Sequence, residues 1–369
     1  MMTFNLATKI ITGENPLGVL DEIKGKRVLI ICDAFLAKCD NLSKIKHQLS
    51  QANTLSVFAD VKPDPTVHDV ANGIAELLTF TPDILLAYGG GSAIDQAKAI
   101  RYLGDKKGGA VEQLIVIPTT SGTGSEVTRA SVISIPEKKA KLPLFDIAML
   151  PDIAILDPQQ TVTVPKAVTA NTGIDVLTHA LEATVSINAN NFSDAMAEKA
   201  ITLVFSHLIE CCQNGNNLQS REQMQHASCM AGIAFDHAGL GLNHALAHQI
   251  GAHLHLPHGL ANALILTRVI EFNCQSLEAL KRYARLAKQL GLIQPDQSDE
   301  DGATRLVEAI EGLRQAVGID GDCQRLGVKI PDSETEITAM ADAALQDVTL
   351  TTNPVTPTQA DIIAILKSL

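Results

Sequence analysis

The pattern of apolar residues changes once along this chain, near residue 160, and that change constrains the fold more than any other feature. Before it, short runs rich in β-branched residues recur, such as Arg27–Asp33 (RVLIICD) and Asp83–Tyr88 (DILLAY). Several are continuously apolar, which is typical of strands buried on both faces. Further strands are expected at 55–61, 114–118, 130–135 and 153–156, and helices between the early strands at 42–49, 66–78 and 93–102. This alternation predicts a parallel sheet with helices on both sides.

Beyond Asp157-Pro158 the strand signal stops, and Ala- and Leu-rich segments with helical spacing continue almost to the end. Helices are expected at 166–185, 193–212, 220–235, 240–254, 259–273, 276–290, 302–316, 334–346 and 358–368. We therefore expect an α/β domain over residues 1–160 and an all-helical domain over 161–369. A length of 369 residues agrees with two domains.

The charge balance and the cysteines exclude several classes of protein. The chain has 29 Lys and Arg against 41 Asp and Glu, a net charge of −12. An acidic chain is a poor partner for nucleic acid or an anionic membrane surface. The N-terminus lacks a signal-peptide pattern, and no apolar run approaches the ~20 residues that span a bilayer. Seven cysteines without a CxxC pair indicate reduced thiols. We expect a cytoplasmic protein without nucleic-acid or membrane partners.

Two glycine-rich segments follow expected strands. Gly89-Gly-Gly-Ser92 precedes a helix, and glycines let a backbone approach a phosphate at a helix N-terminus. It is not the G-x-G-x-x-G fingerprint, because position 94 is Ile, and alone it is equally well a tight turn. The second segment, 118–126 (PTTSGTGSE), places hydroxyls and backbone N–H groups after a strand, where open α/β sheets bind ligands. A merely flexible loop is the alternative. Together the two segments favour a phosphate-bearing cofactor.

Asp33 ends the first of these strands. A carboxylate in that place can accept a hydrogen bond from a ribose 2′-hydroxyl and repel a 2′-phosphate. It can also cap a helix, and both roles are compatible. The first role favours NAD over NADP.

Histidines are concentrated in the second half, where six of the 11 lie within residues 237–258. His244 and His248 are four residues apart and share a helix face, as do Asp175 and His179. A carboxylate with two or three imidazoles suits Fe(II), Zn(II), Ni(II) or Mn(II). As a set, Asp175, His179, His244 and His258 are hard to explain as core residues. Bland structural or surface roles are favoured for His237, His253 and His255. Glu182 either orients a ligand or lies on the helix surface.

Four segments together resemble the iron-containing (group III) alcohol dehydrogenase family: 89–95 (GGGSAID), 118–128 (PTTSGTGSEVT), 173–182 (GIDVLTHALE) and 241–262. They occur in the family's order. Within it, the chain looks most like the propanol dehydrogenases of propanediol utilisation. The resemblance implies a dehydroquinate synthase-like fold, with a Rossmann-like dinucleotide-binding domain, a helical metal-binding domain and a cleft between them.

The resemblance also implies roles for individual residues. The metal, Fe(II) with Zn(II) as a possible substitute, would be held by Asp175, His179, His244 and His258. His248 would lie near the nicotinamide, and it is our candidate for relaying the proton. Asp33 would face the adenosine ribose, and the pyrophosphate would lie on Gly90, Gly91 and Ser92. The rest of the NAD site would include Thr119, Thr120, Thr123, Lys141 and Leu156.

The expected reaction is reversible hydride transfer between NAD and a short primary alcohol such as propanol. Lactaldehyde, a diol or butanol are alternative substrates. Alternatives of a different class are a metal- and NAD-dependent lyase of the dehydroquinate synthase type and a non-enzymatic metal- or nucleotide-binding module. The resemblance suggests a homodimer or larger oligomer, formed through a strand near 4–11. The resemblance does not decide whether His237 contacts the substrate. Association with a microcompartment is a further expectation, although no encapsulation peptide is evident at 1–7.

Overall fold

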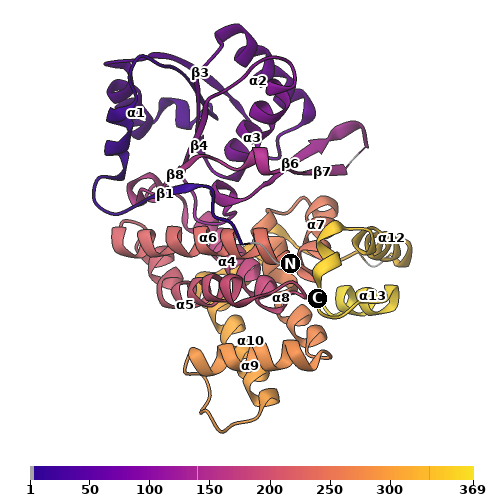
Figure 1. Ribbon diagram of the computed structural model, residues 1–369. Coiled ribbons are helices and arrows are strands. Elements are labelled where there is room, and N and C mark those ends of the chain that lie inside the picture. Colours follow the sequence, from indigo (N-terminus) through magenta and orange to yellow (C-terminus); the bar gives the residue numbers. More distant parts are fainter. Residues whose placement is uncertain (1–3, 139, 332) are drawn as a thin grey trace. The chain divides into compact units, whose positions relative to one another are not determined.

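A parallel six-stranded sheet organises the first of two units, Met1–Val164, in the computed structural model (Figure 1). The structure describes residues 4–138, 140–331 and 333–369, without the side chains of 138, 140 and 141. The strands are β1 (Lys9–Ile11), β2 (Arg27–Asp33), β3 (Thr54–Val61), β4 (Ile84–Gly89), β5 (Gln113–Pro118) and β8 (Ile153–Ile155). They lie in the order β1-β8-β5-β4-β2-β3, and neighbouring strands pair in parallel.

Alternate residues of the central strands enter two separate cores. Leu29 and Ile31 of β2 pack on one face with residues of α2 (Val67–Phe80) and α3 (Gly91–Asp105). Val28 and Ile30 pack on the other face with α1 (Asp40–Ser50). Burial on both faces is why these strands read as continuous apolar runs.

The chain reverses its direction across the sheet between β2 and β4. From β2 it passes through α1 to the edge strand β3, and it then returns through α2 to β4 on the other side of β2. At such a reversal the connections leave the two strand ends in opposite directions, which opens a crevice where α/β sheets bind ligands. The loops after Asp33 and Gly89 border this point.

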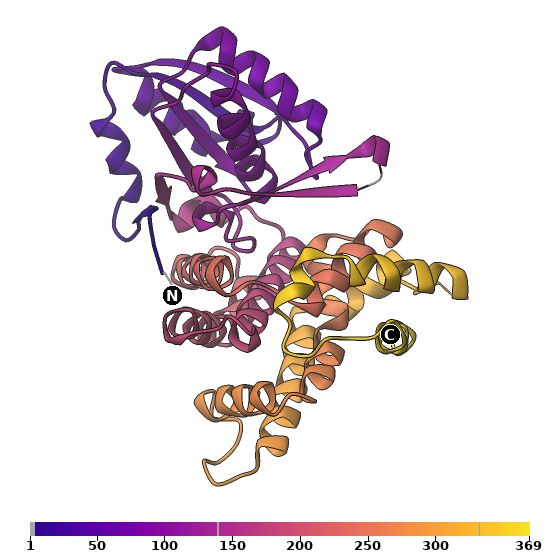
Figure 2. The ribbon, with the colours of Figure 1, turned by 45° about the vertical axis from the view of Figure 1, so that its right-hand side comes forward.

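The structure differs from the sequence-based expectation at two places. The strand expected at 130–135 forms as β6 (Ala130–Ile135), but it pairs antiparallel with an unexpected β7 (Ala140–Phe145), outside the parallel sheet. Figure 2 shows this hairpin as a separate ribbon. Pro143 weakened the β7 signal, although an edge strand tolerates proline. The short helix α11 (Ile319–Leu326) was also not expected.

The second unit, Pro165–Leu369, contains only helices among its described regular elements. They are α4 (Lys166–Val185), α5 (Asn191–Gln213), α6 (Leu218–Ala238), α7 (Leu242–Leu254), α8 (His258–Asn273), α9 (Leu277–Gln289), α10 (Asp299–Val317), α11, α12 (Glu334–Leu345), α13 (Gln359–Lys367) and the 3-10 turn η7 (Val348–Thr352). The predicted order, a parallel-sheet unit followed by helices, is confirmed.

Helix α4 is the central element of the second unit. From Gly173 to Val185 every residue is buried, and the helix packs against α5, α6 and α8. A helix that is buried all round carries even its polar side chains into the interior. The described residues include no helix that is both long and apolar enough to cross a membrane.

Candidate metal centre and nucleotide-binding loops

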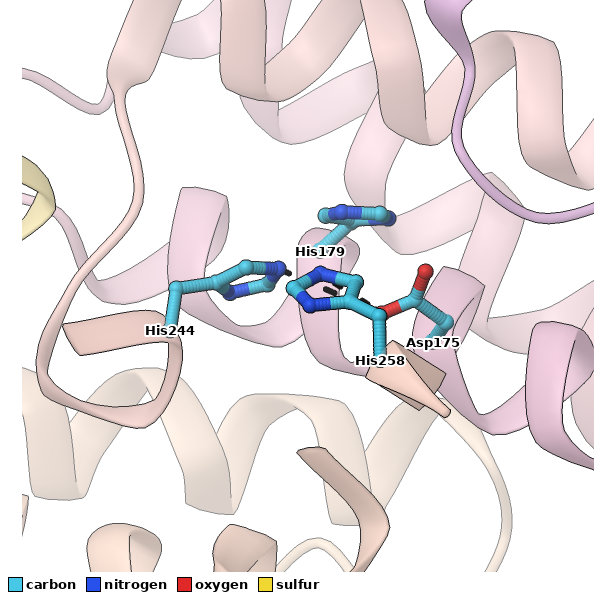
Figure 3. A group of neighbouring side chains, drawn as sticks. All are labelled: Asp175, His179, His244 and His258. Carbon is cyan, nitrogen blue, oxygen red and sulfur yellow. Dashed lines mark ion pairs between the residues drawn. The ribbon is translucent and has the colours of Figure 1, made fainter. Parts of the chain in front are cut away.

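Four potential ligand side chains converge in the second unit (Figure 3). Asp175 and His179 lie one turn apart on α4, His244 comes from α7, and His258 is the first residue of α8. One potential ligand atom from each lies within 4.8 Å of the others. The structure thus brings together the four residues that the sequence singled out.

The spacing of these atoms leaves room for a cation. Asp175 Oδ1 lies 4.0 Å from His244 Nε2 and 3.7 Å from His258 Nε2. These separations are too long for hydrogen bonds, but they suit donors that each lie about 2.0–2.2 Å from one ion. One carboxylate and three imidazoles form a mixed oxygen and nitrogen set, which fits divalent iron or zinc.

Burial keeps the imidazoles of His244 and His258 uncharged. Desolvation lowers the pKa of His244 well below its usual value, and the neighbouring His179 and His248 lower it further. The pKa of His258 is also lowered, mainly by burial. Because a metal binds the neutral imidazole, these shifts prepare the rings as ligands at neutral pH. His258 keeps 36% of its side chain exposed, so the cluster is accessible beside this residue.

Glu182 fixes the orientation of His244 from behind. Its Oε1 accepts hydrogen bonds from the backbone N–H groups of Asn243 (2.7 Å) and His244 (3.3 Å), and its Oε2 pairs with His244 Nδ1. Nε2 of the same ring therefore faces the cluster, as in carboxylate–histidine–metal arrangements. Burial raises the pKa of Glu182 to about 7, although these donors oppose the rise. Glu182 is therefore not on the helix surface.

Asn262 is a residue of this centre that the sequence analysis missed. Its Nδ2 donates to Asp175 Oδ1 at 2.7 Å and lies 3.3 and 3.2 Å from Nε2 of His244 and His258. Its Oδ1 accepts from Asn243 Nδ2 at 2.8 Å, which fixes the amide. A position four residues after His258, on the same helix face, was the available signal.

His179 is held by stacking rather than by hydrogen bonds. Its ring lies between Phe235 and His244, with centroid distances of 4.6 and 4.7 Å. Its Nδ1 is buried without a hydrogen-bond partner among the described residues. Nothing in the sequence near His179 pointed to Phe235 on α6.

His248 lies beside the cluster and outside it. Its ring stacks on that of His258, with centroids 5.5 Å apart. Its Nδ1 lies 2.7 Å from Oδ2 of Asp347, a residue too distant in the chain for any local signal. Burial works to raise the pKa of Asp347, but the hydrogen bond and charge of His248, with Thr349, lower it to about 2. An ionised Asp347 therefore orients the His248 ring.

The remaining histidines of this stretch lie apart from the cluster. His237 Nδ1 contacts the carbonyl of Ile233 at 2.9 Å, within α6. His253 and His255 are exposed at the end of α7.

In the first unit, the two glycine-rich loops lie against each other. A Cβ on Gly90 would lie 3.1 Å from Thr120 Oγ1, and one on Gly91 would lie 2.6 Å from Thr123 Cγ2. The backbone N–H of Thr119 donates to the carbonyl of Gly89 at 3.0 Å. A side chain would crowd the second loop at Gly90 and collide with it at Gly91, beside the start of α3, whose first turn includes Ser92. First-turn N–H groups lack intrahelical acceptors and can bind an anion.

Asp33 holds the turn that follows β2, but it is not the N-cap of a helix, because the N-cap of the 3-10 turn Leu36–Lys38 is Phe35. Asp33 Oδ1 accepts from the backbone N–H groups of Phe35 and Leu36, each at 2.8 Å. Leu36 in turn contacts the next loop, because a Cβ on Gly89 would lie 3.6 Å from Leu36 Cδ1. The carboxylate thus lies at the end of β2, next to the glycine loop that follows β4.

Lys98 anchors the second loop and was not anticipated. Its fully buried ammonium group donates to Ser125 Oγ (2.9 Å), Thr128 O (2.8 Å) and Ala130 O (2.9 Å). Asp95, also on α3, accepts from Ser125 Oγ at 2.5 Å and from the Val132 N–H at 3.0 Å. The helix that begins at the first loop therefore holds the second loop in place.

Leu156 and Lys141 are the last two residues of the expected NAD site. Leu156 is buried after β8, and its N–H donates to Ile11 at 2.8 Å. The backbone of Lys141 pairs with Ser134 in the hairpin, but its side chain is outside the described part of the chain.

Comparisons with known proteins place both halves of the chain in one group. Residues 7–158 match iron-containing alcohol dehydrogenase, and residues 169–369 match the C-terminal part of the Fe-containing alcohol dehydrogenase family. The 1-propanol dehydrogenase PduQ of Salmonella typhimurium is 49% identical over 354 residues, which cover 96% of each chain.

Two other similar proteins are named for different alcohols. The NADPH-dependent butanol dehydrogenase of Clostridium saccharobutylicum is 34% identical over 371 residues, covering 96% of this chain and 94% of that protein. The crystal structure of a 1,3-propanediol oxidoreductase superposes with a TM-score of 0.93 at 34% identity, covering 100% of this chain and 99% of that one.

Proposed function

The chain belongs to the iron-containing alcohol dehydrogenase family, and on that premise we propose that it interconverts 1-propanol and propionaldehyde with NAD as the hydride carrier. It is an NAD-dependent alcohol dehydrogenase. The observation that carries the proposal is the converged set of Asp175, His179, His244 and His258, in which burial lowers the pKa of His244 and His258. The substrate is proposed from the similarity to 1-propanol dehydrogenase PduQ.

The four clustered side chains fit the metal of the family, and they would hold a divalent iron. Bound there, iron would supply Lewis acidity that polarises an alcohol or aldehyde oxygen. Asp175 contributes the negative charge of the set, and Asn262 fixes its carboxylate. Glu182 holds His244 with Nε2 toward the cluster.

His248 is the proposed group for proton transfer. In the neutral tautomer, Nδ1–H donates to the ionised Asp347, and Nε2 is then the basic atom of the ring. During alcohol oxidation this atom would take up the hydroxyl proton, directly or through water, and it would return the proton in aldehyde reduction.

NAD is proposed to bind where the sheet reverses. Gly90, Gly91 and Ser92 would receive the pyrophosphate at the start of α3. Thr119, Thr120, Thr123, Lys141 and Leu156 would complete the site. Asp33 is proposed to select NAD, because the second oxygen of its carboxylate, Oδ2, makes no hydrogen bond to the described residues and would meet the ribose.

A cytoplasmic location, a homo-oligomeric state and a place in a microcompartment stay predictions. The expected contact strand includes β1, which lies at an edge of the sheet. An edge strand can pair with another chain, so the oligomer proposal is tested by measuring the mass of the protein in solution.

The proposed function is tested with anaerobically purified, metal-stripped protein. NADH absorbance is followed with propionaldehyde after addition of Fe(II), Zn(II) or no metal. NADH oxidation that requires a metal supports the dehydrogenase function. If propionaldehyde gives no oxidation of NADH while butyraldehyde or lactaldehyde is reduced, the proposed substrate is wrong and the reduced aldehyde takes its place. Failure with every aldehyde, although NAD binds, would favour the lyase.

A further inference from the structure

Phe35 is the most exposed of the large apolar side chains in the described residues, with 76% of its surface accessible. Isolated apolar side chains are common on protein surfaces and need no explanation by themselves. The position of Phe35, however, is unusual. It lies two residues after the end of β2, at the point where the sheet reverses and the proposed dinucleotide site lies.

The turn that carries Phe35 is fixed on several sides. Asp33 Oδ1 binds the N–H groups of Phe35 and Leu36, and Leu36 packs toward the Gly89 position. A few residues on, Cys39 Sγ lies 3.7 Å from the buried Tyr88 hydroxyl. Asn41 reaches the carbonyl of Gln159, beyond the end of β8, at 3.3 Å. The backbone is thus anchored while the aromatic ring extends from it into solvent.

We propose that the adenine of the dinucleotide stacks on the ring of Phe35. This inference depends on the proposed function. Adenine, ribose and pyrophosphate follow one another in NAD. At the ends of the neighbouring strands β2 and β4, Phe35 offers an aromatic face, Asp33 a carboxylate and the Gly90–Gly91 loop backbone N–H groups. Each group matches the part of the cofactor that it would meet.

The chain contains no tryptophan, so Phe35→Trp creates a single fluorescent reporter at the proposed site. The holoenzyme of this variant is titrated with NAD, AMP and nicotinamide mononucleotide. We expect NAD and AMP to change the tryptophan emission and nicotinamide mononucleotide to leave it unchanged. The matched control is Phe192→Trp, on α5 of the second unit, where the native side chain is 64% exposed. Its emission should not respond to AMP.

Phe35→Ala gives the affinity test without a reporter. Stacking on an aromatic side chain is worth ~1–3 kcal/mol per base, and at the low end this weakens NAD and AMP binding about five- to tenfold. Calorimetry should show that loss, with unchanged affinity for nicotinamide mononucleotide. Phe35→Tyr should restore affinity, and Phe192→Ala should bind as the wild type.

The outcomes separate this inference from the function beneath it. Wild-type affinity of Phe35→Ala for AMP, together with a silent tryptophan at saturating NAD, would overturn the role of Phe35 and leave the dinucleotide site intact. A tryptophan signal that follows protein concentration and not nucleotide would overturn it in favour of a contact with a second copy. Absence of NAD and AMP binding in the wild type would overturn the dinucleotide site, and Phe35 with it.

Discussion

The metal centre of the second unit and the nucleotide loops of the first are built in opposite ways. The metal centre consists of side-chain atoms that come from α4, α7 and α8 and are largely buried. The loops consist of backbone at Gly90 and Gly91, with threonine side chains where any further atoms would collide. One site depends on which side chains are present, and the other depends on the lack of them.

This difference also shows in what supports each site. A carboxylate, Glu182, orients a ligand ring within the metal centre, and Asn262 fixes Asp175. The loops are instead anchored from behind by the buried Lys98 and by Asp95, neither of which occupies the loop surface. Substitutions should therefore damage metal binding and NAD binding separately, and variants at four positions test that separation.

The largest effect is expected for His258→Ala. Removing one of four ligands should abolish bound metal and reduce turnover about a thousandfold or more, since Lewis acidity is worth several kcal/mol. NAD affinity should stay within about twofold, which corresponds to a change of less than 1 kcal/mol. Metal content is measured by elemental analysis and NAD binding by calorimetry. His253→Ala, at an exposed histidine of the same stretch, is the control. Retained metal and activity would refute the ligand assignment.

Glu182→Gln should weaken metal affinity about 10- to 100-fold, as loss of a carboxylate behind a ligating histidine does. Glutamine keeps the size but replaces the carboxylate that pairs with His244 Nδ1. Competition with a chelator measures the affinity. The exposed Glu311 supplies the control, Glu311→Gln. Equal affinity in the two variants would show that Glu182 is only structural.

Gly91→Ala should raise the KM for NADH about tenfold, within the range expected from overpacking, with metal content unchanged. The added Cβ would lie 2.6 Å from Thr123 Cγ2, so the second loop must move. Gly312→Ala, in α10, is the matched control, because no neighbouring atom lies within 4 Å of its added Cβ. Steady-state kinetics gives the KM for NADH of the Gly91→Ala and Gly312→Ala variants. A normal KM in Gly91→Ala would place the cofactor elsewhere.

The smallest effect is expected at Asp33, where two roles must be separated. Asp33→Asn keeps an oxygen that can accept from Phe35 and Leu36 but removes the charge, whereas Asp33→Gly removes both. Both should shift preference toward NADP, by about fivefold for a change near 1 kcal/mol. The ratio of kcat/KM for the two cofactors is the measurement. An unchanged ratio would mean that Asp33 only holds the turn.

The helical spacing of Asp175 and His179 was enough to predict that they share a face, and α4 confirms it. The sequence also predicted the parallel sheet from its uninterrupted apolar strands. Asn262 was within reach of the same argument, being one turn after His258. Asp347 and Lys98 could not be predicted in this way, because each has its partner on another element. Asp347 pairs with His248 of α7, and Lys98 donates to Ser125 of the second glycine-rich loop.

The sequence by itself indicated most of the strands and helices, β7 and α11 excepted, since strand and helix periods are local properties of the chain. It also supplied the ligand residues and the glycines. Only the tertiary structure decided that α7 and α8 meet α4 with His244 and His258 facing Asp175, and that Gly91 lies against Thr123. It also decided that the segment at 130–135 leaves the sheet as a hairpin. These outcomes depend on how separate elements pack, and packing is set by contacts between residues distant in the chain.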